Sequence, residues 1–281
     1  MRGMNNRFKV LICVVGVVAC ASMASAEITM PDIFGDNMVM QRELPVPVWG
    51  SAAPGEKVSV SFAGQTLKTT ADAQGKWMVT LKPLKTSTIE QTMTVSGSNT
   101  VTFSGVVVGE VWLCSGQSNM AGRFVKSKGR AINPKAFEQD LTRFRFTTRQ
   151  GWKPLTQQSQ NLLSCVAYYF GIELYRELKV PVGLILRYNS GTPIQAWMPP
   201  ESAEIIRKKL NIPKDWNDVA EIRNPGVQFN DKIAPILPVA FRGVIWYQGE
   251  RNAKAQTGWE YRHLLPFHIK TWRELWASRA G

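Results

Sequence analysis

Residues 106–119 read VVVGEVWLCSGQSN, an apolar run rich in valine that ends in a loop of small and polar residues. Two later segments repeat this order: residues 182–192 read VGLILRYNSGT, and residues 244–252 read VIWYQGERN. Near-continuous apolar strands are typical of parallel sheets that are covered on both faces. We therefore expect three parallel strands in one sheet, each followed by a polar loop.

Helical patterns lie between and after these strands. Apolar residues recur with helical spacing over residues 167–178, and Pro181 ends that pattern. A second helical run covers residues 261–276. This alternation predicts an α/β fold with a doubly wound parallel sheet. Loops at the carboxyl ends of such strands converge on the ligand, so the three polar loops are expected to face one crevice.

The region before residue 106 has an all-β pattern. Residues 58–62 read VSVSF, and this period of two predicts a strand with one buried face. Turn signals separate it from further short strands, expected at residues 46–49, 65–70, 76–81, 92–96 and 101–103. Strands at this spacing predict a small β-sandwich ahead of the α/β domain. The expected division is a signal peptide at 1–26, a β-sandwich domain at 27–106 and the α/β domain at 107–281.

The first 26 residues have the features of an export signal. Arg2, Arg7 and Lys9 precede a short apolar run, and Ala24-Ser25-Ala26 forms a cleavage site. A competing interpretation is lipidation at Cys20 after cleavage just before it. Both interpretations export the protein to the periplasm or the cell exterior. No later apolar run is long enough to cross a bilayer, so we expect no membrane span.

Composition narrows the function classes. The chain of 281 residues is 44% hydrophobic and 20% charged, which excludes a disordered or fibrous protein. Its formal net charge is +13, but the basic clusters are short and no nucleic-acid-binding module accompanies them. The sequence has neither C-x-x-C nor H-E-x-x-H, so no metal is expected. Cys114 and Cys165, both in apolar stretches, are expected to be buried free thiols.

Three residues in the polar loops suggest ester chemistry. Ser118 follows the first strand, where backbone N–H groups favour a developing negative charge. With the Ser118 N–H, Gly191 and the side-chain amide of Asn252 supply three donors for an oxyanion. Each residue also has an ordinary interpretation: a helix N-cap for Ser118, a turn glycine for Gly191 and a capping asparagine for Asn252. The coincidence of three such loops at three strand ends favours the catalytic interpretation.

The residues around Ser118 resemble a known family. Residues 109–120, GEVWLCSGQSNM, are similar to the nucleophile block of the sialate O-acetylesterase family, a branch of the SGNH hydrolases. The second and third blocks of that family resemble GTPIQAW at residues 191–197 and GVIWYQGERNA at residues 243–253. Residues 34–39 and 45–50 are similar to its leading β-domain. The resemblance covers nearly all of the chain after the signal peptide.

This resemblance implies an SGNH-type fold and an esterase that removes acetyl groups from sialic acid or other acetylated glycans. It implies Ser118 as the nucleophile, with the Ser118 amide, Gly191 and Asn252 as the oxyanion hole. Acyl transfer through serine needs no cofactor. Arg251 departs from the family, which commonly has a small residue there.

The expected general base is missing from the sequence. A serine esterase needs a histidine oriented by a carboxylate, and in this family both come from a D-x-x-H block downstream of the third block. The two histidines of the chain, His263 and His268, fall in the expected helix at 261–276. We interpret Glu260 and His263 as a solvated helix face rather than a catalytic pair. We therefore expect a sheet that is incomplete at the C-terminus, a chain truncated relative to the family, and weak or no activity.

Two other functions remain open. A non-catalytic glycan-binding protein derived from such an esterase would use tryptophans over sugar rings, and the chain has 10. A lipase or general esterase of the SGNH type is the third candidate, and the β-domain argues against it through the family resemblance. The expected partner in the first two cases is an acetylated carbohydrate.

Overall fold

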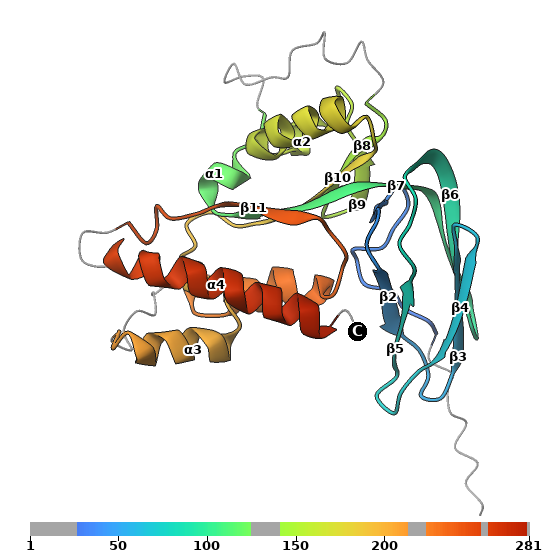
Figure 1. Ribbon diagram of the computed structural model, residues 1–281, viewed down its shortest axis with the longest axis horizontal. Coiled ribbons are helices and arrows are strands. Elements are labelled where there is room, and N and C mark those ends of the chain that lie inside the picture. Colours follow the sequence, from blue (N-terminus) through green and yellow to red (C-terminus); the bar gives the residue numbers. More distant parts are fainter. Residues whose placement is uncertain (1–26, 125–140, 213–222, 254–257, 280–281) are drawn as a thin grey trace, which may run out of the picture.

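The computed structural model describes residues 27–124, 141–212, 223–253 and 258–279. The expected signal peptide, including Cys20, lies outside the described residues. The described chain has two regions that share one long strand, β7 (Thr100–Gly116), as Figure 1 shows. Within the described residues, no helix is both long enough and apolar enough to cross a bilayer.

The N-terminal region is built from short strands. Their bounds are β1 (Val39–Gln41), β2 (Val46–Ser51), β3 (Lys57–Phe62), β4 (Gln65–Thr70), β5 (Lys76–Leu81) and β6 (Ser87–Ser96). One sheet has the order β4-β3-β6-β7, and β2 and β5 form a separate antiparallel pair that faces it (Figure 1). Val60, Leu81 and Met93 are fully buried in the core of this region. The sequence predicted β2 to β5 and residues 92–96 of β6, but not β1 or residues 87–91. The buried face predicted for residues 58–62 is confirmed by Val58, Val60 and Phe62.

Strand β7 differs from its expected form, because the strands expected at 101–103 and 106–114 are one. Phe103 pairs with Met93 and Val106 pairs with Gln91, so β7 carries one more residue than β6 at this point. Gly105 lies in this β-bulge with φ of +68°. The bulge bends the strand without ending it. The expected boundary at residue 106 therefore falls inside a continuous strand, and a division of the chain at that point remains a prediction.

The second region contains a mostly parallel sheet. Its order is β11-β7-β10-β8-β9, with β8 (Phe144–Thr148), β9 (Gly151–Pro154), β10 (Val182–Tyr188) and β11 (Gly243–Tyr247). β10 and β11 flank β7 in parallel, which confirms the three strands expected from the sequence. β11 is more exposed than predicted, with Val244 36% and Tyr247 44% exposed. The reason is that β11 pairs only with β7 in the described part of the chain.

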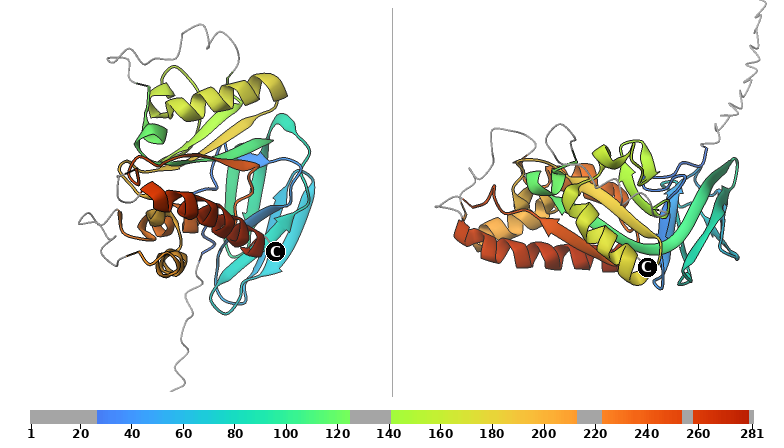
Figure 2. Two further views of the ribbon diagram at one scale, coloured as in Figure 1. Left: turned by 60° about the vertical axis from the view of Figure 1, so that its left-hand side comes forward. Right: turned by 90° about the horizontal axis from the view of Figure 1, so that it is seen from above.

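Helices cover both faces of this sheet. They are α1 (Ser118–Ala121), α2 (Cys165–Leu178), α3 (Pro200–Lys209) and α4 (Gly258–Arg279), with short turns η3 (Gln160–Leu162), η4 (Ile194–Trp197), η7 (Phe229–Ile233) and η8 (Ala234–Ile236). α2 lies on one face, and α3 and α4 lie on the other (Figures 1 and 2). The sheet is therefore doubly wound, as the sequence predicted.

The ends of α2 follow from local chemistry. The Ser164 hydroxyl accepts a hydrogen bond from the Ala167 N–H and caps the first turn. Lys179 has φ of +54°, which ends the helix two residues before Pro181. Cys114 and Cys165 are free thiols as expected, although Cys165 is only half-buried.

Candidate active site

The three parallel strands end level with one another. Gly116 of β7 pairs with Tyr188 of β10 on one side and with Tyr247 of β11 on the other. The loops that follow these three residues therefore begin side by side at one edge of the sheet. The strand order thus brings together segments that are about 60–70 residues apart in sequence.

Gly116 allows the strands to approach closely at this edge. Its φ is +135°, and a Cβ atom at this position would lie 2.1 Å from the Tyr247 carbonyl oxygen. The Gln117 N–H donates to the same Tyr247 carbonyl at 2.9 Å, and the Asn189 N–H donates to the Gly116 carbonyl at 3.1 Å. Backbone hydrogen bonds therefore join the first loop to both of its neighbours.

Gln248 connects the three loops through its side chain. Its buried Nε2 lies 3.1 Å from Gln117 Oε1, 3.1 Å from the Thr192 carbonyl oxygen and 2.8 Å from Asn252 Oδ1. These acceptors come from the loops after β7, β10 and β11 respectively. The two hydrogens of this buried amide nitrogen are shared among the three acceptors, and the group holds the loops in one arrangement.

Asn252 is held by the same network. Its side chain is buried, and Oδ1 accepts a second hydrogen bond, from the Ile194 N–H at 2.9 Å. Its Nδ2 donates to Gln195 Oε1 at 3.1 Å. The carboxamide plane is therefore fixed against the start of η4, which follows the second loop.

Ser118 is exposed at this edge of the sheet. It is the first residue of α1 and follows the N-cap position, which Gln117 occupies. The interpretation of Ser118 as a helix N-cap is therefore wrong. Its Oγ accepts a hydrogen bond from Gln117 Nε2 at 3.4 Å. Because α1 has only four residues, its dipole adds little to the local field, and the nearby N–H groups matter more.

Gly191 lies in the turn that opens the second loop, with φ of +72°. A Cβ atom there would meet only Arg223 Nη2, at 3.9 Å, so there is room for a side chain. Glycine is favoured at this position because of its backbone conformation. The turn is fixed by Thr192, whose hydroxyl donates to the Asn189 carbonyl at 2.9 Å. Trp197 Nε1 in turn donates to that hydroxyl, at 2.9 Å.

His268 is enclosed by aromatic rings. It is buried, and its ring centroid lies 4.4 Å from that of Trp272 and 4.7 Å from that of Trp246. Burial in this apolar environment lowers the pKa of His268 to about 3, so the imidazole is neutral at pH 7. No hydrogen bond joins it to the three loops among the described residues.

His263 lies on the exposed side of α4, as expected. Its Nε2 accepts a hydrogen bond from Arg262 Nε at 3.1 Å. Glu260 does not share this exposed face, because it is buried, and burial raises its pKa. The solvated helix face was therefore predicted correctly for His263 and wrongly for Glu260. No hydrogen bond connects the two among the described residues.

Gln117 and Gln248 are the structural residues that the sequence interpretation missed. Each is a glutamine beside a glycine in a loop of small residues, at Gly116-Gln117 and at Gln248-Gly249. A long amide side chain in such a loop is a signal for a hydrogen-bonding hub. The donors expected at Ser118, Gly191 and Asn252 belong to the loops that these two glutamines connect.

Comparisons with known proteins bear on this site. A carbohydrate esterase family model, described as a sialic acid-specific acetylesterase, matches residues 108–274. The chain is 31% identical to the sialate O-acetylesterase of Homo sapiens over 278 residues, covering 85% of this chain and 51% of that protein. It is 27% identical to the sialate O-acetylesterase of Mus musculus over 301 residues, covering 85% and 55% respectively.

A solved structure is also similar. The crystal structure of a carbohydrate acetylesterase from Xanthomonas citri superposes with a TM-score of 0.77 at 29% sequence identity. The match covers 89% of this chain and 58% of that one. The chain therefore spans about half the length of the curated relatives it matches.

Proposed function

This chain belongs to the sialic acid-specific acetylesterase family of carbohydrate esterases, and from that premise we propose that it cleaves O-acetyl esters of glycans through an acyl-serine intermediate. The observation that carries the proposal is the exposed Ser118 beside three loops that Gln248 joins. A nucleophile at the end of a central strand, next to fixed amide groups, is the arrangement that acyl transfer requires.

The proposed reaction has two steps. Ser118 Oγ attacks the acetyl carbonyl carbon and gives up its proton, which passes to the departing sugar oxygen as the ester bond breaks. Water then attacks the acetyl-serine and releases acetate, returning the proton to Ser118. The N–H groups of Ser118 and Gly191 and the amide of Asn252 stabilise the oxyanion in both steps, each contributing roughly 3–4 kcal/mol.

The proton transfers need a general base near Ser118. Neither histidine of the chain is placed to act as that base, and we therefore expect proton transfer to limit the rate. The pKa of His268 is lowered to about 3 by burial, and its ring packs against Trp246 and Trp272. His263 is exposed on α4 and contacts Arg262. Loss of the base from a serine hydrolase lowers kcat by about 10⁶-fold. The 281 residues on their own are therefore expected to turn over slowly, with the oxyanion donors supplying the residual rate.

Chemical rescue tests this proposal. The experiment measures p-nitrophenyl acetate hydrolysis by the wild-type chain and by Ser118→Ala, with and without added imidazole as an external base. We expect slow turnover without imidazole and a Ser118-dependent increase with it. Mass spectrometry should detect one acetyl group on the wild-type chain and none on Ser118→Ala. The serine variant also corrects for hydrolysis by imidazole itself.

Two results would contradict the proposal in different ways. Equal rates for wild type and Ser118→Ala at every imidazole concentration would exclude acyl transfer through Ser118. Fast Ser118-dependent turnover without imidazole would show instead that a base within the chain reaches the serine.

The positions of the histidines favour one alternative, a non-catalytic glycan-binding protein. In that case the joined loops would hold an acetylated sugar without cleaving it. Binding of an acetylated glycan that is unchanged in Ser118→Ala, with no acetate release at any imidazole concentration, would support this alternative.

Export is part of the same proposal. The cleavage pattern at Ala24-Ser25-Ala26 gives a mature chain that begins at Glu27, and lipidation at Cys20 would give one that begins at the modified cysteine. Mass spectrometry of the N-terminus of protein recovered from the periplasm or the medium distinguishes the two.

A further inference from the structure

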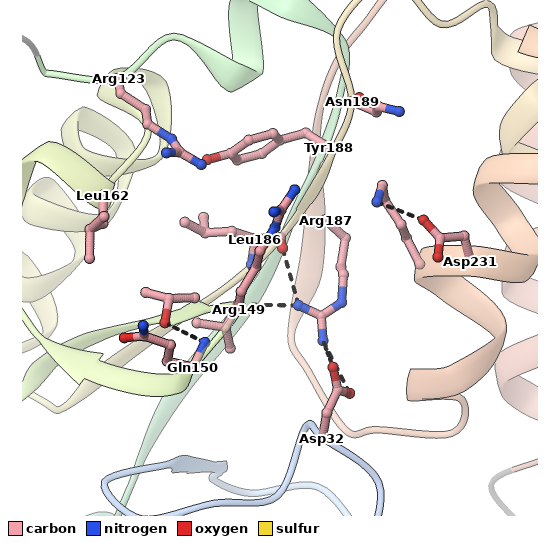
Figure 3. Close-up of a pocket in the computed structure, with 13 residues that line it drawn as sticks. Asp32, Arg123, Arg149, Gln150, Leu162, Leu186, Arg187, Tyr188, Asn189 and Asp231 are labelled. Atoms are coloured by element: carbon pink, nitrogen blue, oxygen red, sulfur yellow. Dashed lines mark hydrogen bonds and ion pairs between the residues drawn. The ribbon is translucent and has the colours of Figure 1, made fainter. Parts of the chain in front are cut away.

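A cavity adjoins the loops of the candidate active site. Its volume is about 560 Å³, which lies in the range of small-ligand pockets and leaves room for more than an acetyl group. Segments far apart in the chain line it, among them the turn before β1, the segment after α1, the turn between β8 and β9, and the end of β10 (Figure 3). The part of an ester substrate that leaves with the alcohol oxygen can lie here.

Tyr188 provides an aromatic ring to this cavity and lies close to Ser118. It is the last residue of β10 and pairs with Gly116, two residues before Ser118. Neighbouring strands of a sheet are roughly 5 Å apart. A substrate whose ester group lies at Ser118 therefore has this tyrosine about one strand spacing away.

The Tyr188 ring has a packed core on one side and the cavity on the other. It is half-buried and packs against the core cluster that contains Phe144 and Phe146. Figure 3 shows the side chain extending from the end of β10 towards Arg123, along one wall of the cavity. Among the described residues, its hydroxyl has no hydrogen bond and its ring contacts no other aromatic ring. The ring is therefore supported from behind and open in front.

The residues on either side of Tyr188 fix its backbone. Arg187 is largely buried, with 13% of its side chain exposed, and its Nη2 lies 3.5 Å from Asp32 Oδ2. Its Nη1 donates to the Leu186 carbonyl at 3.2 Å. On the other side, the Asn189 N–H donates to the Gly116 carbonyl at 3.1 Å. These contacts hold the end of β10 against the turn before β1 and against β7.

Other groups that line the cavity are polar. Thr148 contributes a hydroxyl group, and Gln150 and Asn189 contribute amides. A pyranose ring has surfaces that match both kinds of lining, because its faces present C–H bonds and its rim carries hydroxyl groups. A tyrosine, with an apolar ring and a polar tip, is suited to a ligand of this kind.

We infer that Tyr188 determines specificity: the pyranose ring of the substrate packs a C–H face on the Tyr188 ring while its acetyl ester lies at Ser118. The inference rests on the proposed function and adds a preference to it, for esters of sugar rings over small alkyl esters. The contact uses C–H bonds, so it does not depend on the charge of the sugar. Ethyl acetate can reach the oxyanion donors but is too short to cover the tyrosine.

The selectivity between two kinds of ester tests this contact. The substrates are O-acetylated methyl β-xylopyranoside, O-acetylated N-acetylneuraminic acid and ethyl acetate, with imidazole present; p-nitrophenyl acetate is unsuitable because its own ring can pack on the tyrosine. For the sugar ester that is cleaved faster, Tyr188→Ala should lower the ratio of its kcat/KM to that of ethyl acetate by about five- to tenfold. Tyr188→Phe keeps the ring and should keep the wild-type ratio.

Both rates are measured on one preparation, so any loss of folded protein cancels in the ratio. Tyr169→Ala is the matched control, because Tyr169 is 63% exposed on α2 and does not line the cavity. It should leave the ratio at its wild-type value. An unchanged ratio in Tyr188→Ala, or an equal loss in Tyr188→Phe and Tyr188→Ala, would overturn the inference.

A binding measurement separates this inference from the proposed function. Saturation-transfer NMR, with irradiation of the aromatic protons of the protein, detects contact with the C–H protons of methyl β-xylopyranoside or N-acetylneuraminic acid without turnover. We expect transfer that Tyr188→Ala loses and Tyr188→Phe keeps. Such transfer without Ser118-dependent acetate release would leave the ring contact standing and exclude the esterase. Ser118-dependent release with transfer that is absent, or unchanged in Tyr188→Ala, would leave the proposed function standing and exclude the contact.

Discussion

The two halves of β7 lie in different environments. Residues 100–105 alternate between exposed and half-buried side chains and face one antiparallel neighbour, β6. Residues 106–116 are almost all buried, and from residue 112 onward β7 has a parallel neighbour on each side. Side chains of the first half are partly exposed to solvent, so we expect this half to tolerate a larger side chain by a small local shift. The second half is enclosed, and it leads to the loop in which Ser118 is exposed.

The two halves should differ most in how much stability is lost when a glycine is replaced by alanine. A Cβ at Gly116 would lie 2.1 Å from a backbone oxygen, whereas a Cβ at Gly105 would meet the end of the Asn37 side chain, at 2.8 Å. We expect Gly116→Ala to lower the free energy of unfolding by more than about 4 kcal/mol. Gly105→Ala should lower it by about 1–2 kcal/mol, the cost of a left-handed conformation for a residue with a side chain.

Urea denaturation of the two alanine variants measures this contrast. Both glycines have positive φ, but the φ of +135° at Gly116 is less accessible to alanine than the φ of +68° at Gly105. The difference between the two variants therefore reports the collision between strands together with this extra backbone strain. Similar losses at the two sites would mean that the edge of the sheet at Gly116 can open, and that the halves do not differ in rigidity.

Two glutamines, Gln248 in the loop after β11 and Gln91 opposite Val106, give a second comparison. Gln248→Met keeps the side-chain size but removes the donor that contacts the acceptors on Gln117, Thr192 and Asn252. We expect it to cost about 1–3 kcal/mol of stability and to reduce Ser118-dependent acetate release. The matched control is Gln91→Met on β6, opposite Val106 at the junction of the two halves, which should change stability by no more than about 0.5 kcal/mol.

Thermal unfolding and imidazole-rescued hydrolysis should be measured on both methionine variants. A Gln248→Met chain with wild-type hydrolysis would show that the loops keep their arrangement without this hub. Reduced hydrolysis in Gln91→Met would show that the junction between the two halves of β7 also shapes the site.

The smallest effect is expected at Glu110, near the middle of β7. Burial raises the pKa of Glu110, but hydrogen bonds and charge from Arg242 and Arg42 outweigh it, so the pKa lies below its ordinary value. A lowered carboxyl pKa stabilises the fold above the unfolded value of about 4.3, and this contribution is lost as pH falls through the folded value. Glu110→Gln should therefore be less stable by about 1 kcal/mol at pH 7, with the difference shrinking below about pH 4.

Denaturation from pH 7 to pH 3 checks this dependence. The control is Glu274→Gln, whose partner Lys270 is 3.7 Å away on the exposed surface of α4, and which should change stability little at any pH. A difference between wild type and Glu110→Gln that does not vary with pH would mean that the ion pairs contribute nothing.

The sequence predicted the parts of the fold in which apolar residues are buried and polar residues are exposed. The buried runs and the loops after them were recognised because apolar strands and polar loops have distinct compositions. Strand β8 was missed because Phe-Arg-Phe-Thr-Thr at residues 144–148 places a charge where the core lies. Arg145 is 2% exposed, and its guanidinium is satisfied by Glu90 and by the carbonyls of Asn37 and Gly105. Those partners are distant in sequence, so no local pattern predicts them.

The sequence identified the three loops of the candidate site but not the side chains that connect them. Ser118, Gly191 and Asn252 were chosen from their loops, and strand pairing brings those loops together. The positions of His263 and His268 on α4 were predicted, but the burial of Glu260 was not.

Strand β7 belongs both to the N-terminal sheet and to the parallel sheet, and this has a consequence for protein engineering. β1 pairs with residues 107–109, and β6 pairs with residues as far along β7 as Val108. A graft that moved the N-terminal sheet to another enzyme would have to carry β7 as well, and Ser118 follows its last residue by only two positions. The N-terminal sheet and Ser118 would therefore be transferred together, with the spacing between them set by the length of β7.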